Sequence, residues 1–315
     1  MRIALIGPGI MPIPPPGWGA VEILIWDYYN ELIKLGNDVT IINTKDIMSI
    51  VNTVNDGNFD FVHLHYDVFY IILHHLKCPK IAITSHYPYI DQPDKHNPDG
   101  YYRVFGFLIQ QTRYYNFVLA DKDVNTFLRF RADPSKIRKI KNGINSSLFR
   151  FSDTPLFNKS IYLGKITPRK NQAKYQYLPD IDFVGNNADP HFNTSTPNYL
   201  GEWTRTKIYE DLTHYTNLVL FSQGEADPLV VKEALIAGLG VVVNRSSAEN
   251  LDPSLDFITV IDDSQMYDLE YVKMKIEENK EKSRTQRMKI RDYGISNFDI
   301  SIEVKKYVDI INSIE

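Results

Sequence analysis

The sequence lacks several features that would each place it in a particular class of protein. Its 315 residues include a single cysteine, Cys78, which excludes an intrachain disulfide and any zinc site built on several cysteines. No run of 18 uncharged apolar residues is present, so no membrane-spanning helix is predicted. Positive charge is not in excess: 35 Lys and Arg residues against 39 Asp and Glu residues give a net charge of −4, which excludes a nucleic-acid-binding protein that depends on bulk positive charge.

Signatures of other chemistries are missing as well. The G-x-G-x-x-G fingerprint is absent, because Pro12 and Ile13 stand where its third glycine is expected, and this argues against a conventional NAD site. No serine lies in a G-x-S-x-G turn, so no Ser-His-Asp triad is assigned. His63 and His65 face one side of a predicted strand, but no third ligand stands at a telling spacing, so no metal site is predicted. The apolar part of residues 1–7 is too short for a signal peptide, and we expect a cytoplasmic protein.

What is present is the composition and rhythm of an α/β protein. Hydrophobic residues make up 43% and charged residues 23% of the chain, which is typical of a globular protein, and the length favours two domains. Short, continuously apolar segments alternate with longer amphipathic ones, as expected for parallel strands covered by helices on both faces. Strands are predicted at residues 3–6, 38–43, 59–64, 80–85, 117–120, 137–141, 160–163, 181–184, 217–221, 241–244 and 257–261.

The same rhythm restarts after a polar stretch that contains a proline, at residues 152–155. We therefore predict a first domain at residues 1–151, a second at 152–296, and a C-terminal segment at 297–315 that holds an amphipathic helix. Both domains are predicted to be doubly wound α/β domains. Ligands of such domains bind beyond the carboxyl ends of the strands, so the loops there are where chemistry is expected.

The segment that follows the predicted strand at 217–221 carries two acidic residues. Asp227 is a plausible helix N-cap and Pro228 a plausible first helical residue. Glu233 then lies on an otherwise apolar face of the helix, where a carboxylate needs a partner such as the hydroxyls of a ribose. Glu225 lies just before the helix, near its positive end. The alternative is that Glu225 is a solvated acid of the loop and Glu233 a residue at the rim of the helix.

The segment that follows the predicted strand at 160–163 is rich in positive charge. Gly164 permits a close backbone approach, and Lys165, Arg169 and Lys170 supply three cations within six residues, which suits a diphosphate. A solvated basic turn is the alternative. The aromatic stretch at 101–115 likewise has two interpretations, a core helix with tyrosines at its rim or a face that contacts a membrane surface or an acceptor.

Five segments, in this order along the chain, resemble motifs of the retaining glycosyltransferases of family 4. These enzymes have the GT-B fold, in which two Rossmann-like domains face each other across a cleft. The resemblance covers nearly the whole sequence. The segments are the Gly/Pro-rich loop at 14–22, His86 after a predicted strand, the element Lys141-Asn142-Gly143-Ile144-Asn145 with Phe149, the phosphate loop of Gly164 and Lys165 with Lys170, and the E-x7-E pair of Glu225 and Glu233.

The resemblance implies a donor site in the second domain for a nucleotide-diphospho-sugar such as a UDP- or GDP-sugar. Lys165 and Lys170 are expected to neutralise the diphosphate, and Glu233 to bind the ribose hydroxyls. His86 and Glu225 are expected to act on the donor sugar as catalytic residues. The further donor contacts that it implies are Gly19, Gly164, Ala226, Asp227, Pro228, Leu229 and Val230.

The resemblance also implies how transfer proceeds. A hydroxyl acceptor (a glycan, a lipid or a small molecule) is expected to bind to the first domain, onto which the C-terminal helix returns. Front-face attack by this hydroxyl retains the anomeric configuration, and no metal or other cofactor is required. Contact with a membrane is expected to be at most peripheral, and no nucleic acid is an expected partner.

The sequence departs from the family pattern at three points. Lys165 replaces the usual arginine, which removes bidentate phosphate binding there. Ala226-Asp227-Pro228 replaces the usual Gly-Phe-Gly, and Ala20 stands where a second glycine is usual. These departures concern the contacts with the sugar. They keep two alternatives to a hexosyltransferase open: a related GT-B enzyme such as a nucleotide-sugar epimerase or a phosphorylase, and a non-catalytic nucleotide-sugar-binding module.

Overall fold

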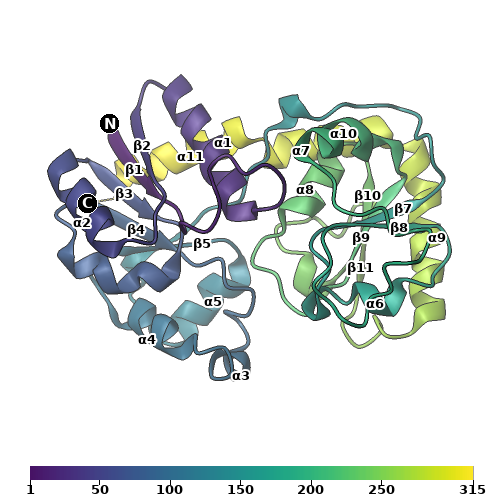
Figure 1. The fold of residues 1–315 in the computed structure, drawn as a ribbon, viewed down its shortest axis with the longest axis horizontal. Helices are drawn as coiled ribbons and strands as arrows, with labels where there is room; N and C mark the ends of the chain where they lie inside the picture. The colour runs from purple at the N-terminus through teal and green to yellow at the C-terminus, as the bar shows by residue number, and fades with distance from the viewer. Residues whose placement is uncertain (315) are drawn as a thin grey trace. The chain divides into compact units, whose positions relative to one another are not determined.

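Each half of the chain builds its own parallel β-sheet in the computed structural model, which describes residues 1–314 (Figure 1). The first sheet has the strand order β2-β1-β3-β4-β5-β6, and the second has the order β11-β10-β9-β7-β8. Every pair of neighbouring strands is parallel. The strands are β1 (Arg2–Ile6), β2 (Asp38–Ile42), β3 (Phe61–Leu64), β4 (Lys80–Thr84), β5 (Tyr115–Val118), β6 (Ile137–Lys139), β7 (Ser160–Leu163), β8 (Ile181–Val184), β9 (Asn217–Leu220), β10 (Gly240–Asn244) and β11 (Ile258–Ile261).

Helices connect the strands in both sheets. The α-helices are α1 (Ala20–Lys34), α2 (Ile47–Gly57), α3 (Pro93–His96), α4 (Tyr102–Gln110), α5 (Asp121–Arg129), α6 (Gln172–Tyr175), α7 (Arg205–Asp211), α8 (Leu229–Ile236), α9 (Leu269–Thr285), α10 (Arg287–Phe298) and α11 (Ile300–Ser313). The 3-10 helices are η1 (Asp67–His75), η2 (Pro134–Lys136), η3 (Ser146–Leu148), η4 (Pro168–Lys170), η5 (Leu212–His214) and η6 (Arg245–Ser247). Every residue of β3, β5, β7, β8, β9 and β10 is buried, so both faces of these strands are covered. The predicted class, two doubly wound α/β domains, is confirmed.

Neither of the two units is a single continuous segment of the chain. The first unit contains Met1–Pro15, Gly19–Gly143 and the C-terminal segment from Ile300, whereas the second contains Pro16–Trp18 and Ile144–Asp299. The residues just after Gly143 group with the second unit because Ile144 and Phe149 are buried in its core.

The last helix belongs to the first unit. Tyr307 of α11 is completely buried against α1 and β3, where its hydroxyl forms a 2.8 Å hydrogen bond with Nδ1 of His63. Its ring also meets the ring of Tyr28 edge to face at 4.8 Å. The first unit is therefore built from both ends of the chain.

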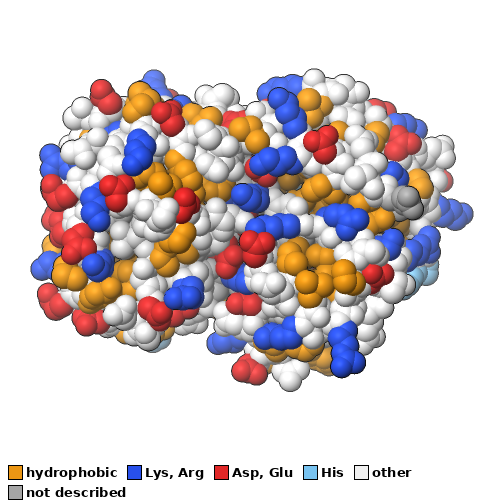
Figure 2. Space-filling model, turned by 180° about the vertical axis from the view of Figure 1, so that it is seen from behind, with side chains coloured by type: hydrophobic (Ala, Val, Ile, Leu, Met, Phe, Trp, Pro, Cys, Tyr) orange, Lys and Arg blue, Asp and Glu red, His pale blue; other side chains and the backbone are white. Residues whose placement is uncertain are grey.

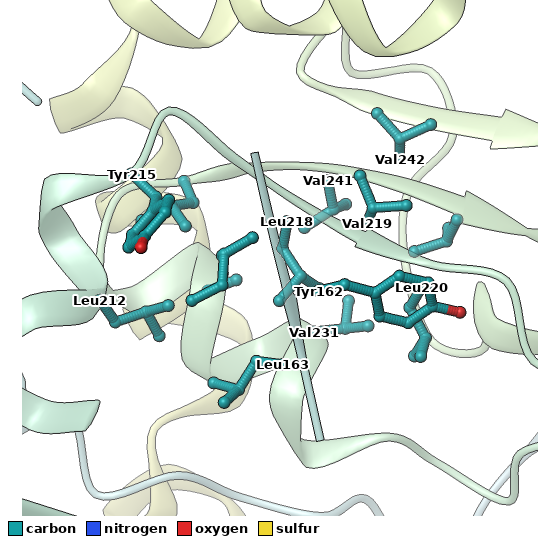
Figure 3. Close-up of a cluster of buried hydrophobic side chains, with 14 of the residues drawn as sticks. Tyr162, Leu163, Leu212, Tyr215, Leu218, Val219, Leu220, Val231, Val241 and Val242 are labelled. Atoms are coloured by element: carbon teal, nitrogen blue, oxygen red, sulfur yellow. The ribbon is translucent and has the colours of Figure 1, made fainter. Parts of the chain in front are cut away.

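Part of the core of the second unit lies between its sheet and α8. Side chains of β7, β9, β10 and α8 converge there, including Leu163, Leu218, Val231 and Val241 (Figure 3). Burying each aliphatic side chain of this size contributes about 1.5–3 kcal/mol relative to exposure. This packing holds α8, with the polar residues it carries, firmly against the sheet.

The surface carries charges of both signs. On the face seen in Figure 2, Lys and Arg side chains are interspersed with Asp and Glu side chains, as expected from the near balance of charge in the sequence.

The aromatic stretch at 101–115 folds as α4 and β5, with Tyr101, Phe105 and Leu108 in the core and Tyr102 exposed, so the interpretation as a core helix is correct. None of the helices among residues 1–314 combines the length and the apolar composition that crossing a bilayer requires.

Candidate functional site in the second unit

Two loops of the second unit meet at one edge of its sheet. One loop follows β7 and the other follows β9, and these two strands are neighbours in the sheet. Because parallel strands end at the same edge, the polar residues of both loops lie close together. Tyr162, buried at the end of β7, ties the loops to each other: its hydroxyl donates to the carbonyl of Lys170 and accepts a 2.8 Å hydrogen bond from the amide of Phe221.

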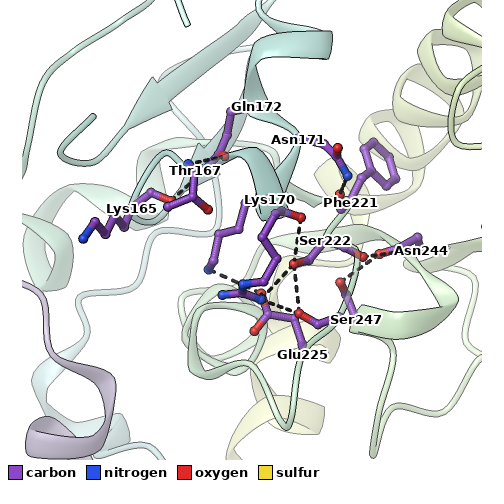
Figure 4. A network of polar contacts seen from close by, with 12 residues as sticks. Lys165, Thr167, Lys170, Asn171, Gln172, Phe221, Ser222, Glu225, Asn244 and Ser247 are labelled. Carbon is purple, nitrogen blue, oxygen red and sulfur yellow. Dashed lines mark hydrogen bonds and ion pairs between the residues drawn. The ribbon is translucent and has the colours of Figure 1, made fainter. Parts of the chain in front are cut away.

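The centre of this arrangement is the carboxylate of Glu225. It accepts a 3.0 Å hydrogen bond from Arg169 and forms an ion pair of 3.5 Å with the ammonium of Lys170 (Figure 4). Arg169 also donates to the carbonyl of Gly224 and, at 3.1 Å, to Oγ of Ser222. The loop after β9 is therefore held by the cations of the loop after β7.

The charges of this cluster do not cancel. Burial opposes ionisation of Glu225, but Lys170 and Arg169 outweigh it and hold the pKa of this carboxyl below its ordinary value. Glu225 is therefore an anion at neutral pH, and the cluster of two cations and one carboxylate retains one positive charge. A half-buried surplus cation of this kind is suited to an anionic ligand such as a phosphate.

Gly164 leaves room beside the surplus cation. Its φ of +139° lies in a region that side chains with a Cβ rarely adopt, and a Cβ there would lie 3.2 Å from Nζ of Lys170. Lys165 and Lys170 are the two lysines expected at the diphosphate, and that role of Lys165 stays a prediction. Lys165 is exposed and extends away from Lys170 and Glu225 (Figure 4). Arg169, not Lys165, is the second cation beside Glu225. In the sequence, the signal that could have identified Arg169 at this site is the run of three cations, Lys165, Arg169 and Lys170.

Glu233 lies on α8 with its side chain only 5% exposed. Its carboxylate accepts a 2.6 Å hydrogen bond from Arg205, the first residue of α7. Arg205 also donates to the hydroxyl of Tyr209 and stacks on its ring at 4.7 Å. The prediction that this buried carboxylate needs a partner is correct, but the partner within the chain is a guanidinium that the sequence analysis did not identify.

The start of α8 differs from the sequence prediction. The N-cap is Pro228 and the helix begins at Leu229, so the N-cap role of Asp227 and the helical position of Pro228 were wrong. The carboxylate of Asp227 instead forms an ion pair with Lys232, one turn into the helix. Of the other predicted donor contacts, Leu229 is buried, and Ala226 and Val230 are half-buried.

Two of the predicted site residues, His86 and Gly19, lie in the first unit. His86 follows β4, and its Nε2 is shielded from solvent with no hydrogen-bond partner among residues 1–314. Burial lowers the pKa of His86 to about 4, so its imidazole is neutral at pH 7. The ring of His65 stacks beside it at 6.0 Å. Within the part of the chain that the structure describes, no three His, Cys, Asp or Glu residues are grouped so as to hold a metal ion.

Gly19 precedes α1 with a φ of +128°. A Cβ at this position would lie 3.1 Å from the carboxylate of Glu22 and 3.3 Å from the ring of Pro15. Only glycine fits this turn without strain. Gly19 and His86 thus belong to the first unit, while the second unit brings together Gly164, Lys170 and Glu225.

Comparisons of the sequence give no match: no family model matches it, and no curated protein matches it. Comparisons of the fold do. The chain is similar over its whole length to a sucrose-phosphate synthase from Thermosynechococcus elongatus (TM-score 0.77, 13% identity, 100% of each chain covered). It is also similar to Anabaena HepE in complex with UDP-glucose (TM-score 0.74, 13% identity, 99% of this chain and 100% of that chain covered). A third match is WaaG, a glycosyltransferase involved in lipopolysaccharide biosynthesis (TM-score 0.68, 13% identity, 99% and 100% covered).

These neighbours are GT-B glycosyltransferases, and the two parallel sheets of the chain are arranged in the order of that fold. The prediction of a GT-B fold with two Rossmann-like domains is confirmed. At 13% identity the likeness concerns the fold, so the activity has to be argued from the residues at the site.

Proposed function

We propose that the protein is a retaining glycosyltransferase that transfers a sugar, specifically a hexose, from a nucleotide-diphospho-sugar to a hydroxyl acceptor. The observation that carries this proposal is the cluster of Arg169, Lys170 and Glu225 at the carboxyl ends of β7 and β9. Its surplus positive charge, next to the open backbone at Gly164, suits the diphosphate of such a donor. The fold supports the proposal, because HepE, with the same fold, was solved in complex with UDP-glucose.

In this proposal the chain's own cations replace a metal ion. Lys170 faces the diphosphate and stabilises the charge that develops on the leaving group as the glycosidic bond breaks. Glu233 accepts hydrogen bonds from the ribose hydroxyls through the oxygen that Arg205 does not hold, and Glu225 contacts the donor sugar. His86, which is neutral at pH 7, is the second proposed catalytic residue that acts on the donor sugar. The acceptor hydroxyl attacks from the face that the leaving group departs from.

A non-catalytic nucleotide-sugar-binding module is the second candidate. It is favoured by the carboxylates themselves, because Glu225, Glu233 and Asp227 each already have a cationic partner within the chain. Turnover distinguishes the candidates. A transferase releases free nucleoside diphosphate when an acceptor is present, an epimerase converts the donor without an acceptor, and a binding module does neither.

The donor site is tested with Lys170→Ala. Thermal shifts are measured with UDP-, GDP- and ADP-glucose, since a ligand at 100 times its Kd stabilises a protein by about 2.7 kcal/mol. Loss of one charge-assisted contact is expected to weaken the bound nucleotide sugar by about 10- to 100-fold. The matched control is Lys174→Ala, which removes an exposed lysine of α6 whose ammonium lies over the ring of Tyr267. Equal binding by wild type and Lys170→Ala would refute the assignment of the diphosphate to this cluster.

A further inference from the structure

A buried ion pair lies just behind the loop that leads into α8. The side chains of Asp227 and Lys232 are 0% and 1% exposed, and they contact each other directly. The other carboxylate oxygen of Asp227 accepts a 3.1 Å hydrogen bond from the side-chain amide of Asn250. The ammonium of Lys232 also lies over the ring of Phe298, 5.2 Å from its centre. Asp227 therefore points into the protein.

Stability alone is a poor reason for such a pair. Removing two charges from water costs more than an exposed ion pair does, and well-packed apolar residues of similar volume are often equally or more stabilising. The contribution of the pair is to fix the backbone where the loop meets α8. The pair joins residues five positions apart, across the point where the loop ends and α8 begins, whereas the ion pairs along a helix surface join residues three or four apart.

The loop is anchored at its other end as well. Arg169 binds the carbonyl of Gly224 and the carboxylate of Glu225. Between these anchors and Asp227 only Ala226 remains, and Pro228 beyond it has a ring that fixes φ near −69°. The backbone from Glu225 to Pro228 is thus held from both sides, although it carries the residues that depart from the family pattern.

We propose that Lys232 is a positioning residue that acts through Asp227 and sets the backbone of this loop for the sugar half of the donor. The inference rests on the proposed function. The proposal also changes the role of Asp227, whose carboxylate does not contact the donor but holds the loop in place through its buried ion pair with Lys232. In the proposed function, the nucleotide half of the donor contacts Glu233 and the cluster of Arg169, Lys170 and Glu225. Binding of the nucleotide therefore does not depend on the buried ion pair.

The experiment compares the binding of UDP with that of UDP-glucose, or of GDP and ADP with their glucose conjugates if wild type prefers those bases. The main variant is the double mutant Asp227→Asn/Lys232→Met, which removes both buried charges together. Lys232→Met alone leaves an unpaired buried carboxylate, and the double mutant serves where that single variant fails to fold. Kd values come from calorimetry, and circular dichroism checks that each variant is folded.

In the double mutant we expect the Kd of the nucleoside diphosphate to change by less than about 3-fold and that of the nucleotide sugar to rise by about 10-fold or more. The contrasting variant is Arg205→Gln, which disturbs the partner of Glu233 and should weaken both ligands by a similar factor. A merely structural role of the pair predicts parallel changes in the double mutant, and that result would overturn the inference. So would a sugar-selective loss in Arg205→Gln. If wild type binds none of these ligands, the proposed function itself fails.

Discussion

Replacing Gly294 by alanine should push α8 away from α10, and the structure sets the size of the effect. A Cβ at Gly294 would lie 2.8 Å from the backbone nitrogen of Ile236, 2.8 Å from the carbonyl carbon of Leu235 and 3.1 Å from Cα of Ile236. All three are backbone atoms of α8 or its end, which cannot rotate aside. Non-bonded heavy atoms prefer separations of about 3.5 Å or more, so the helices must move apart by roughly 0.5–1 Å.

Two terms of opposite sign determine the outcome. Glycine in a helix interior costs about 1 kcal/mol relative to alanine, so the substitution gains that amount from helix propensity. Overpacking of a well-packed core costs about 1–3 kcal/mol, and here the clash involves backbone, which places the cost at the upper end. The net loss is therefore about 1–2 kcal/mol, equivalent to a decrease in Tm of roughly 2–8 °C for a domain of this size.

Gly106→Ala is the matched control, because Gly106 also lies inside a helix, α4, but a Cβ there meets no atom within 4 Å from residues 1–314 beyond its own stretch of helix. Its propensity gain is unopposed, and Tm should rise. Scanning calorimetry measures both variants, with and without the nucleotide sugar, since displacement of α8 also moves Glu233. If Gly294→Ala raises Tm as Gly106→Ala does, the close contact between α8 and α10 is not as described.

Three further predictions concern the charges. His86→Ala should leave donor binding unchanged and slow transfer by about 10²-fold. Because burial keeps the pKa of His86 at about 4, the pH profile of wild-type kcat should show no histidine inflection between about pH 6 and pH 8. An inflection there that disappears in His86→Ala would contradict this. Lys170 and Arg169 lower the pKa of Glu225 despite its burial, so the ion pairs stabilise the fold above the ordinary carboxyl pKa of 4.5, and this contribution is lost as pH falls through the lowered value. Unfolding free energies of wild type and Glu225→Gln should therefore converge in acid, and a constant difference would refute the linkage. EDTA should leave transfer unchanged, because Lys170 and Arg169 supply the positive charge, whereas activity restored by Mg²⁺ would refute that role.

The fold could be predicted because its signals are local. The apolar segments at 160–163 and 217–221 are too continuous for strands with a solvated face, and the structure confirms them as β7 and β9 in the middle of a sheet. The loops that carry Lys170 and Glu225 were chosen by the rule that ligands bind beyond the carboxyl ends of parallel strands, whereas the neighbouring positions of β7 and β9 came from the structure. The amphipathic helix of the C-terminal segment was also predicted, and the structure confirms it as α11.

The partners of the buried charges could not be predicted. Arg205 and Glu233 are 28 residues apart, and neither sequence segment indicates the other. Lys232 occupies a position where helical spacing favours an apolar side chain, and only the tertiary structure shows that Asp227 turns inward to meet it. Sequence patterns fix which face an element buries, whereas the pairing of charges depends on which elements then become neighbours.

The placement of α11 determines the order in which the chain can fold as it is synthesised. Chains emerge from the ribosome with the N-terminus first, and domains generally complete their folding in that order. Here His63 and Tyr28 must wait for Tyr307, which is translated after the whole of the second unit, before their part of the core closes. Of the two units, the one that is begun first is therefore finished last, and the nascent first sheet keeps an apolar surface uncovered until α11 has been translated.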